Sequence, residues 1–388
     1  MSQAKDARTH ARIQPGEPAP GFTQQSLSNP QYAFDTAAGR YLVLCYYGQA
    51  SDPHAQAAIA AAQARPDLFN DTRCAFFGVT TDPEDARQKR IRTRVPGYRH
   101  FIDTDLVIAK RYGVAPLAAP DAPVQLVDLA RRWVIISPAM RILAVVPFRD
   151  DQGDLAEVMG RLDALPPVAE FAGIALQAPI LFLPDVFEPA LCQHLIGLYE
   201  EDGGFESGFM REIDGRTVGV SDKGHKSRKD CTITDRALIA TLQNRIARRV
   251  VPEIAKAHQF HVTRMERYIV SCYAAEDGGH FAAHRDNTTK GTAHRRFAVS
   301  INLNDDFDGG EVSFPEYGPR GFKAPAGGAV VFSCGLLHQV STVTRGRRYA
   351  FLPFLYDDAA ARIREENAKF VGQSGSSYAA GSVAGAGG

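Results

Sequence analysis

Long apolar stretches and cysteines at CxxC spacing are missing from this chain of 388 residues. The best apolar stretch, Trp133–Arg141, contains a proline and ends at an arginine, well short of the roughly 20 residues that span a membrane. The N-terminus is polar, so we expect no signal peptide and no membrane partner. The cysteines lack CxxC spacing, which is typical of free thiols in a reducing cytoplasm. They are Cys45, Cys74, Cys192, Cys231, Cys272 and Cys334.

An excess of charge of one sign is also missing. The formal net charge is +0, which argues against nucleic acid as the main partner. Hydrophobic residues make up 45% of the chain, as in soluble globular proteins. The chain is also longer than a domain with a single hydrophobic core usually is. We therefore predict two domains with a linker and a tail. The expected ranges are 12–165 for the first domain, 166–178 for the linker, 179–370 for the second domain and 371–388 for a disordered tail.

The first domain alternates between apolar strands and helices. Tyr41–Tyr47 is a continuous apolar strand, the alanine-rich helix His54–Ala64 follows, and Cys74–Val79 is the next buried strand. Trp133–Ile136 and Ile142–Val146 are expected to form a hairpin. Buried strands joined by helices predict a largely parallel sheet covered on both faces.

This half resembles a peroxiredoxin of the AhpC/TSA type, which implies an α/β thioredoxin-like fold. The matching segments are Gly16–Phe22, Leu42–Tyr47, Gly78–Asp82, Phe101–Asp105, Ala109–Val114 and Val134–Pro138. A peroxiredoxin needs a thiolate at the start of the helix after the first strand, where the helix N-terminus lowers the thiol pKa. The corresponding loop, Tyr47–Ala55, has no cysteine, so we expect a degenerate domain without peroxidase activity. Substrate docking, homodimerisation and partner binding stay open as its role.

The second domain carries a metal-binding pattern. His284 and Asp286 are two residues apart, and in an extended strand such residues point to the same side. His338 follows 54 residues after His284. Two histidines and one carboxylate can occupy one face of an octahedral metal, as in non-haem Fe(II) oxygenases. The short strands and Gly/Pro turns between them favour a jelly-roll barrel that brings the three residues together.

Residues 178–355 resemble the prolyl-4-hydroxylase-like branch of the Fe(II)/2-oxoglutarate dioxygenases. The matching elements are Pro179–Phe187, Tyr273, the His284-x-Asp286 pair, Gly309–Glu311, His338 and Gly346-x-Arg348. The resemblance implies a double-stranded β-helix (jelly-roll) barrel with flanking helices. It implies Fe(II), 2-oxoglutarate and O2 as cofactor and co-substrates, with ascorbate as reductant. The expected reaction hydroxylates an amino acid or a peptidyl side chain and yields succinate and CO2.

The same resemblance assigns roles to residues around the metal. Arg348 is expected to bind the distal carboxylate of 2-oxoglutarate, and Tyr273 to line the co-substrate pocket, although a core role for this tyrosine stays open. Asn302 stands where many relatives have an aromatic residue, so the amide or Ser300 is expected to substitute in the pocket. A two-residue Arg345–Gly346 hairpin would put Arg348 on the opposite strand face from His338. We therefore predict a bulge or an odd-length loop there.

Two further candidates lie outside these motifs. The polar segment 211–230 is expected to be an exposed mobile loop or a lid over the site, and Arg228 is its candidate for contact with an anionic substrate. His280 is expected to support the metal site or to face the substrate. Helices are predicted after Pro189 and from Asp235 because leucines recur there at helical spacing. The alternative function is a thiol peroxidase or redox sensor acting through Cys45 or Cys74.

Overall fold

The computed structural model describes residues 10–117, 127–372 and 380–382, and the chain divides into two compact units. Unit 1 comprises Met1–Leu176 with Pro315–Pro319, and unit 2 comprises Gln177–Phe314 with Arg320–Gly388. The division after Leu176 falls inside the predicted linker. Within the described ranges, no helix is both long and apolar enough to cross a membrane.

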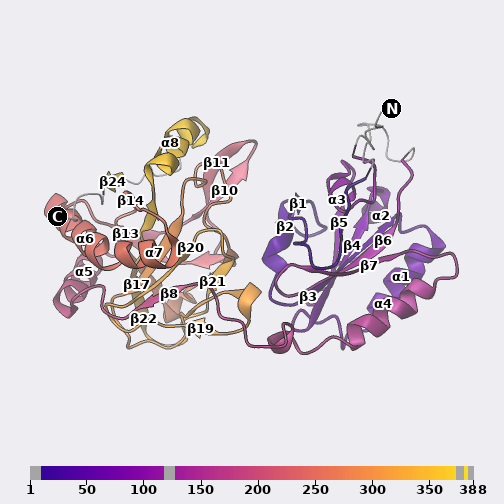
Figure 1. Ribbon diagram of the computed structural model, residues 1–388, viewed down its shortest axis with the longest axis horizontal. Coiled ribbons are helices and arrows are strands. Elements are labelled where there is room, and N and C mark those ends of the chain that lie inside the picture. The colour runs from indigo at the N-terminus through magenta and orange to yellow at the C-terminus, as the bar shows by residue number, and fades with distance from the viewer. Residues whose placement is uncertain (1–9, 118–126, 373–379, 383–388) are drawn as a thin grey trace, which may run out of the picture. The chain divides into compact units, whose positions relative to one another are not determined.

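Unit 1 is built on one five-stranded sheet (Figure 1). Its strands are β3 (Tyr41–Gly48), β4 (Cys74–Thr80), β5 (Tyr98–Ile102), β6 (Arg132–Ile136) and β7 (Ile142–Pro147). The order is β5-β4-β3-β6-β7; β3, β4 and β5 run parallel, and β6 and β7 form the predicted antiparallel hairpin. This mixed sheet with helices on its faces confirms the thioredoxin-like fold.

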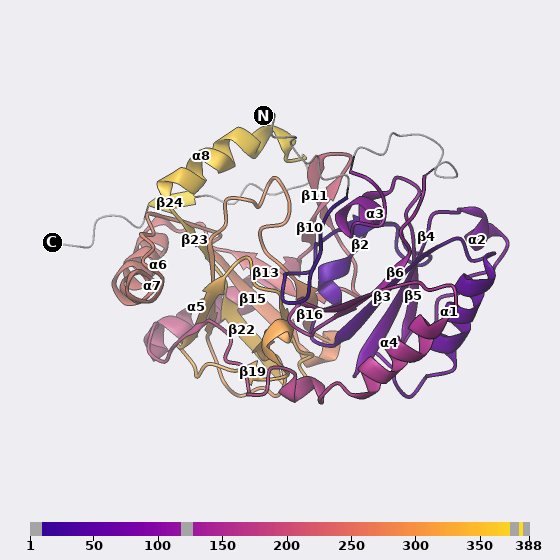
Figure 2. The ribbon, with the colours of Figure 1, turned by 45° about the vertical axis from the view of Figure 1, so that its right-hand side comes forward.

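Two helices cover one face of this sheet. They are α1 (Pro53–Gln63) and α4 (Gly153–Asp163), which lie side by side in Figures 1 and 2. Helix α1 starts at Asp52, whose carboxylate accepts hydrogen bonds from the His54 and Ala55 backbone amides. All eight residues of β3 are buried, as expected for a central strand covered on both sides. The smaller elements are β1 (Thr23–Gln24), β2 (Tyr32–Ala33), η1 (Phe34–Ala37), α2 (Glu84–Arg87), α3 (Val107–Arg111) and η3 (Val168–Glu170).

Unit 2 is a barrel of two sheets. The larger contains β8 (Leu181–Leu183), β9 (Phe205–Glu206), β13 (Lys229–Thr232), β14 (Arg264–Glu266), β15 (Ile269–Ala274), β17 (Phe297–Asn302), β20 (Ala329–Ser333), β22 (Arg347–Phe351), β23 (Phe354–Tyr356) and β24 (Ala380–Ser382). The smaller contains β12 (Lys226–Ser227), β16 (His280–His284), β18 (Val312–Ser313), β19 (Gly321–Phe322) and β21 (His338–Val340). The smaller sheet has the order β12-β16-β21-β18-β19, all antiparallel, as in a jelly roll.

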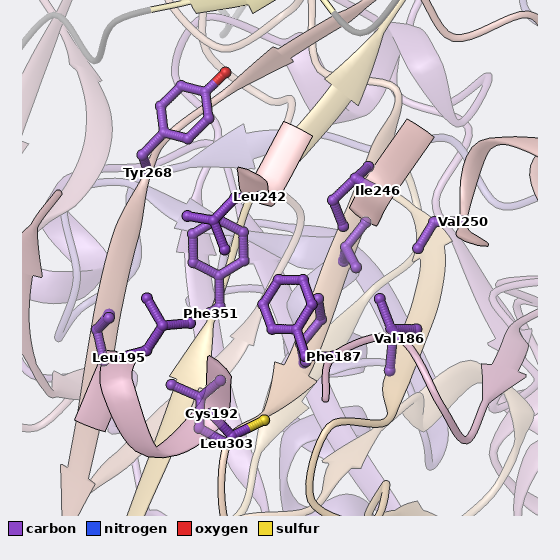
Figure 3. Packing of buried hydrophobic residues seen from close by; sticks show 14 of the residues in the cluster. Val186, Phe187, Cys192, Leu195, Leu242, Ile246, Val250, Tyr268, Leu303 and Phe351 are labelled. Atoms are coloured by element: carbon purple, nitrogen blue, oxygen red, sulfur yellow. The ribbon is translucent and has the colours of Figure 1, made fainter. Parts of the chain in front are cut away.

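Helices brace the outer face of the larger sheet. They are α5 (Pro189–Asp202), α6 (Arg236–Arg249) and α7 (Val251–His258), and the first two confirm the predicted helices. Figure 3 shows Leu195 of α5 and Leu242 and Ile246 of α6 gathered with Phe351 of β22, all fully buried. The other helical elements of unit 2 are α8 (Asp358–Asn367), η4 (Ala275–Asp277) and η6 (Ala368–Phe370), whereas η5 (Pro315–Tyr317) belongs to unit 1.

The prediction of a loop over residues 211–230 is wrong. This segment contains the hairpin of β10 (Phe209–Ile213) and β11 (Arg216–Val220), followed by β12 and the start of β13. The run looks like a loop because it is polar, but Arg228 and Asp230 turn inward and form an ion pair of 2.7 Å. Buried charges that neutralise each other are compatible with a strand.

A bulge or an odd-length loop was predicted around Arg345–Gly346 on the premise that the strands of His338 and Arg348 form a hairpin, and this premise is wrong. Strand β21, with His338, pairs within the smaller sheet, whereas β22, with Arg348, pairs with β15 and β17 in the larger sheet. The chain crosses from one sheet to the other between β21 and β22. The alternation of side chains along paired strands therefore does not decide how Arg348 is oriented relative to His338. Of the predicted tail, residues 373–379 and 383–388 lie outside the described residues, and Ala380–Ser382 pairs with β14.

Candidate metal and co-substrate site

The predicted metal ligands meet in a cavity between the two sheets of unit 2. Atoms of His284, Asp286 and His338 that can bind a metal lie within 4.8 Å of one another. Asp286 Oδ1 is 3.5 Å from His284 Nε2, and its Oδ2 is 3.3 Å from His338 Nε2. The two histidines face each other because they are paired residues of the antiparallel strands β16 and β21. One carboxylate and two imidazoles therefore converge on one point.

Local hydrogen bonds orient these ligands. His284 Nδ1 lies 2.8 Å from the Ala282 carbonyl oxygen, and His338 Nδ1 lies 3.0 Å from that of Leu336. A carbonyl partner requires a proton on Nδ1, which leaves the Nε2 lone pair free for a metal. Asp286 lies two residues past the end of β16 rather than inside a strand, and its amide donates to the Cys334 carbonyl at 3.0 Å.

Burial and mutual contact shift the pKa values of His338 and Asp286 toward their metal-binding protonation states. Burial, followed by the neighbouring His284, lowers the pKa of His338 to about 4. Burial raises the pKa of Asp286, but the adjacent His338 and His284 imidazoles outweigh it, so the net pKa lies below the usual value. At neutral pH the site thus offers a neutral His338 imidazole and an ionised Asp286 carboxylate.

Arg348 lies in the wall of the same cavity and is almost fully buried. Its Nε donates to Asn302 Oδ1 at 2.9 Å and its Nη2 donates to Ser300 Oγ at 2.7 Å. Its Nη1 is buried and has no partner among the described residues. Burial lowers the pKa of Arg348 from its usual value, yet an arginine stays charged in a protein. A fixed cation with a spare donor is therefore presented to the cavity.

Comparison with known proteins agrees with this geometry. Residues 268–356 match the 2OG-Fe(II) oxygenase superfamily. Residues 15–142 match the AhpC/TSA family. Among curated relatives, a PKHD-type hydroxylase of Synechococcus sp. (strain JA-2-3B'a(2-13)) is 33% identical over 89 residues, covering 21% of this chain and 39% of that protein. Another from Pseudomonas fluorescens (strain Pf0-1) is 40% identical over 91 residues, with the same 21% and 39% coverage. The chain thus spans about two fifths of the length of these relatives.

Two solved structures are similar to one unit each. A prolyl hydroxylase from Trichoplax adhaerens, solved with a hypoxia inducible factor peptide fragment, is 15% identical, covers 54% of this chain and 94% of its own, and has a TM-score of 0.37. Peroxiredoxin Q of Xanthomonas campestris is 16% identical, covers 37% of this chain and 90% of its own, and has a TM-score of 0.31.

Tyr273 and Asn302, two predicted pocket residues, hold different positions around Arg348. Tyr273 is paired with Arg348 across β15 and β22, its ring centroid lies 5.3 Å from the Arg348 guanidinium, and it lines the cavity. Asn302 does not line the cavity, because its Nδ2 donates to the Ala324 carbonyl at 2.8 Å while its Oδ1 accepts from Arg348. Asn302 therefore orients Arg348, whereas Ser300 both binds Arg348 and lines the cavity.

The last two candidates, Arg228 and His280, also differ in position, because the first lines the cavity and the second does not. Arg228 lies deep in the barrel rather than on a lid: Nη2 donates to Asp230 at 2.7 Å and Nη1 to the Tyr273 hydroxyl at 3.3 Å. Its Nε is buried without a partner among the described residues, and the side chain lines the cavity. His280 contacts the carbonyl oxygens of Gly278 and Gly224 at 2.7 and 3.3 Å and does not line the cavity.

Sequence reasoning missed several cavity residues, among them Phe281 and Arg267. Phe281 stacks on the His284 ring with centroids 3.6 Å apart, and the pairing of β16 with β21 becomes irregular between these two residues. Arg267 lines the cavity from the turn between β14 and β15 with a positive φ of 74°. A phenylalanine beside the motif could have been noticed, but nothing in the sequence marks an arginine in a left-handed conformation.

The AhpC/TSA-like unit holds its thiols away from any reactive position. Cys45 is inside β3 and Cys74 begins β4, and all six cysteines of the chain are free and buried. Burial, followed by the nearby Asp154 carboxylate, raises the pKa of Cys45 well above its usual range, and burial also raises that of Cys74. At the start of α1, His54 Nε2 instead lies 3.1 Å from Asp154.

Proposed function

We propose that this protein is an Fe(II)- and 2-oxoglutarate-dependent dioxygenase that hydroxylates an amino acid or a peptidyl side chain. One observation carries the proposal: His284, Asp286 and His338 converge in a cavity whose wall holds a buried arginine with a spare donor. The match of residues 268–356 to the 2OG-Fe(II) oxygenase superfamily supports it.

The donor set fits both groups that the proposal requires. Two imidazoles and one carboxylate suit Fe(II) and leave three metal positions for other ligands. A buried guanidinium N–H without a partner costs on the order of 1–3 kcal/mol, so Arg348 Nη1 favours an anion in the cavity. The distal carboxylate of 2-oxoglutarate supplies such an anion and matches the planar arginine fork.

Each residue then has a defined task. His284, Asp286 and His338 bind the metal, Arg348 binds the distal carboxylate, and Asn302 and Ser300 hold the guanidinium in place. When bound, Fe(II) and 2-oxoglutarate supply an oxidation in which O2 gives one oxygen atom to a substrate C–H bond and one to succinate, with release of CO2. Apolar side chains exclude water from this part of the cavity. They include Val299, Val312, Phe332 and Leu352.

Unit 1 is proposed to lack peroxidase activity, because its buried thiols are protonated and none lies at the start of α1. Its role as a docking or homodimerisation unit stays a prediction. A cytoplasmic location is proposed from the free cysteines.

The proposal is tested by reconstituting the purified protein with Fe(II), ascorbate and 2-oxoglutarate. We expect one Fe(II) per chain and succinate formation above that of His284→Ala, which removes one ligand. His280→Ala is the matched control, since this histidine shares β16 but contacts only backbone carbonyls. Absence of bound iron in the wild-type protein, or equal succinate formation by His284→Ala, would contradict the proposal.

A further inference from the structure

Asp286 is held differently from the two histidines of the metal cluster. His284 and His338 lie on the paired strands β16 and β21, so the strand pairing fixes their backbone. Asp286 lies two residues past the end of β16, in the segment 285–296 that joins β16 to β17. Its amide donates to the Cys334 carbonyl at 3.0 Å, which fixes one side of its backbone. The position of this ligand therefore depends on contacts other than regular strand pairing.

One such contact comes from Arg295, near the other end of the same segment. Its Nη1 lies 3.5 Å from the backbone carbonyl oxygen of Asp286, at the outer limit of hydrogen-bond distance, where the attraction is mainly electrostatic. Its guanidinium lies 4.0 Å from the ring centroid of Phe354, which lines the cavity. The side chain of Arg295 is 11% exposed. A largely buried cation therefore contacts both the backbone of a metal ligand and the wall of the cavity.

Glu266 holds this guanidinium in place. It is the last residue of β14 and is buried. Its Oε1 accepts from Arg295 Nε at 3.0 Å, and its Oε2 accepts from His294 Nε2 at 3.0 Å. Burial raises the pKa of Glu266, but the His294 hydrogen bond and the Arg295 charge outweigh it and lower the pKa to about 2. The carboxylate is therefore ionised at neutral pH and compensates the charge of Arg295.

The C-terminal helix α8 adds a further partner to the same carboxylate. Arg364 of α8 has its Nε 3.2 Å from Glu266 Oε2. If the Arg295 side chain is removed, His294 and Arg364 still bind Glu266, so no buried carboxylate is left without a partner. Arg295 can therefore be substituted without the large cost of an uncompensated buried charge.

We propose that Arg295 is a positioning residue for the metal ligand Asp286 and that Glu266 holds Arg295 in its place. The inference rests on the proposed dioxygenase function and adds the residues that fix one of its metal ligands. The ion pair with Glu266 and the contact with Phe354 orient the guanidinium, and its Nη1 then attracts the Asp286 carbonyl. Substitution of groups that orient metal ligands typically weakens metal binding by roughly 10–100-fold.

The test measures the binding of Co(II) alone to the purified full-length protein. Co(II) binds nitrogen and oxygen ligands as Fe(II) does, and somewhat more tightly. Its visible absorption bands also report the geometry of the ligands. We expect Arg295→Gln to stay folded by circular dichroism, to raise the Kd for Co(II) by at least about tenfold and to change the visible spectrum. A Kd and a spectrum equal to those of the wild type would overturn the proposal.

Arg296→Gln is the matched control. Arg296 is the next residue of the same segment, and its Nη1 donates to the Ala293 carbonyl at 2.8 Å rather than to Asp286. We expect this variant to bind Co(II) as the wild type does. An equal weakening in Arg296→Gln and Arg295→Gln would overturn the proposal, because any change in the segment would then disturb the site.

The part played by Glu266 is tested with Glu266→Gln, alone and combined with Arg295→Gln. If Glu266 acts through Arg295, its substitution raises the Kd for Co(II) in the wild type but has no further effect in Arg295→Gln. The same rise in the wild type and in Arg295→Gln would overturn this part of the proposal. Glu266→Asp, which keeps the charge on a shorter side chain, replaces Glu266→Gln in the comparison if the glutamine variant does not fold.

Failure of the proposed function gives a different result from failure of this inference. If the metal site itself is wrong, the wild-type protein binds Co(II) no better than His284→Ala does, and both proposals are overturned. If only the positioning role is wrong, the wild type binds Co(II) more tightly than His284→Ala, and Arg295→Gln binds it as the wild type does.

Discussion

The buried carboxylates of unit 1 and the buried cations of unit 2 differ in how completely they are hydrogen-bonded. In unit 1, Asp154 accepts from Trp133 Nε1 at 2.8 Å, from the Arg149 amide at 3.2 Å and contacts His54. Asp103 likewise accepts from the Tyr46 hydroxyl and from two amides at the start of α3. These carboxylates are satisfied inside the fold and have a structural role.

In unit 2, two buried arginines each have a donor left over, and both face one cavity. Arg348 Nη1 and Arg228 Nε have no partner among the described residues, and both side chains line the cavity that holds the metal-ligand cluster. Buried polar groups without partners are costly and uncommon in a stable fold. Asp154 and Asp103 of unit 1 thus contribute to stability, whereas Arg348 and Arg228 of unit 2 keep part of their hydrogen-bonding capacity for ligands.

The largest expected effect concerns the buried ion pair of Arg228 and Asp230 in unit 2. Asp230→Asn removes the one carboxylate that binds Arg228 and leaves a buried uncompensated cation, so we expect a loss of about 3–5 kcal/mol in the free energy of unfolding. Chemical denaturation followed by circular dichroism measures it. Asp235→Asn, at the N-cap of α6, is the control, because asparagine caps a helix as well as aspartate does. A loss under about 1 kcal/mol would show that unit 2 does not depend on this ion pair.

Unit 1 is expected to show a pH dependence of its own. Burial lowers the pKa of His100 to about 4, below the value near 6.5 of an unfolded chain. The unfolded state therefore takes up the proton first, so the contribution of His100 is complete above pH 6.5 and is lost as the pH falls towards 4. The total change is about 3 kcal/mol, at 1.36 kcal/mol for each pKa unit.

Trp133 provides the readout for this prediction, since it is the single tryptophan of the chain and is buried in unit 1. The wild-type protein should lose more stability between pH 6.5 and 4 than His100→Gln does, as measured by tryptophan fluorescence in denaturant. His258→Gln, at the exposed end of α7, is the control. Parallel pH profiles for wild type and His100→Gln would show that His100 makes no contribution.

The third prediction addresses the spare donor of Arg348. Arg348→Gln removes a charge-assisted contact to the distal carboxylate, and we expect the Kd for 2-oxoglutarate to rise by roughly 100-fold, or about 3 kcal/mol. Metal binding should persist, because the three ligands stay in place. The neighbour Arg347, which is exposed and pairs with Glu276, gives the control Arg347→Gln. Isothermal titration calorimetry of the metal-loaded protein measures this Kd. An unchanged Kd would show that Arg348 does not bind 2-oxoglutarate.

Local patterns were sufficient to predict much of this molecule. The apolar run of β3, the hairpin of β6 and β7 and the helices α5 and α6 follow from periodicity, which depends on neighbouring residues alone. The candidate metal ligands His284, Asp286 and His338 could be predicted because their residue types stand in a fixed order along the chain, and the structure brings them together.

Features that depend on distant partners were not predictable in this way. The polarity of residues 211–230 predicts a loop, because the sequence does not show that Asp230 neutralises Arg228 inside the barrel. The orientation of Arg348 could not be predicted from the Arg345–Gly346 turn. It depends on the pairing of β22 with β15 in the larger sheet, and β15 is far away in the sequence. The left-handed backbone of Arg267 has no sequence signal at all.

The smallest expected effect concerns the support of Arg348 by Ser300. Ser300→Ala removes the acceptor of Nη2, and we expect 2-oxoglutarate to bind roughly three- to tenfold more weakly, since one hydrogen bond contributes about 1 kcal/mol. Titration of the metal-loaded variant measures the change, and an unchanged Kd would show that the serine does not support the guanidinium.

Because Ser300 also lines the cavity, the same loss could come from a direct contact with the co-substrate. The two routes are distinguished by adding Ser300→Ala to Arg348→Gln and comparing the two single variants with the double variant. If Ser300 acts through Arg348, the serine substitution has no further effect once the guanidinium is gone. If Ser300→Ala instead raises the Kd by the same factor in the wild type and in Arg348→Gln, the hydroxyl binds 2-oxoglutarate itself. The cavity of unit 2 would then contain a ligand contact in addition to its unpartnered arginine donors.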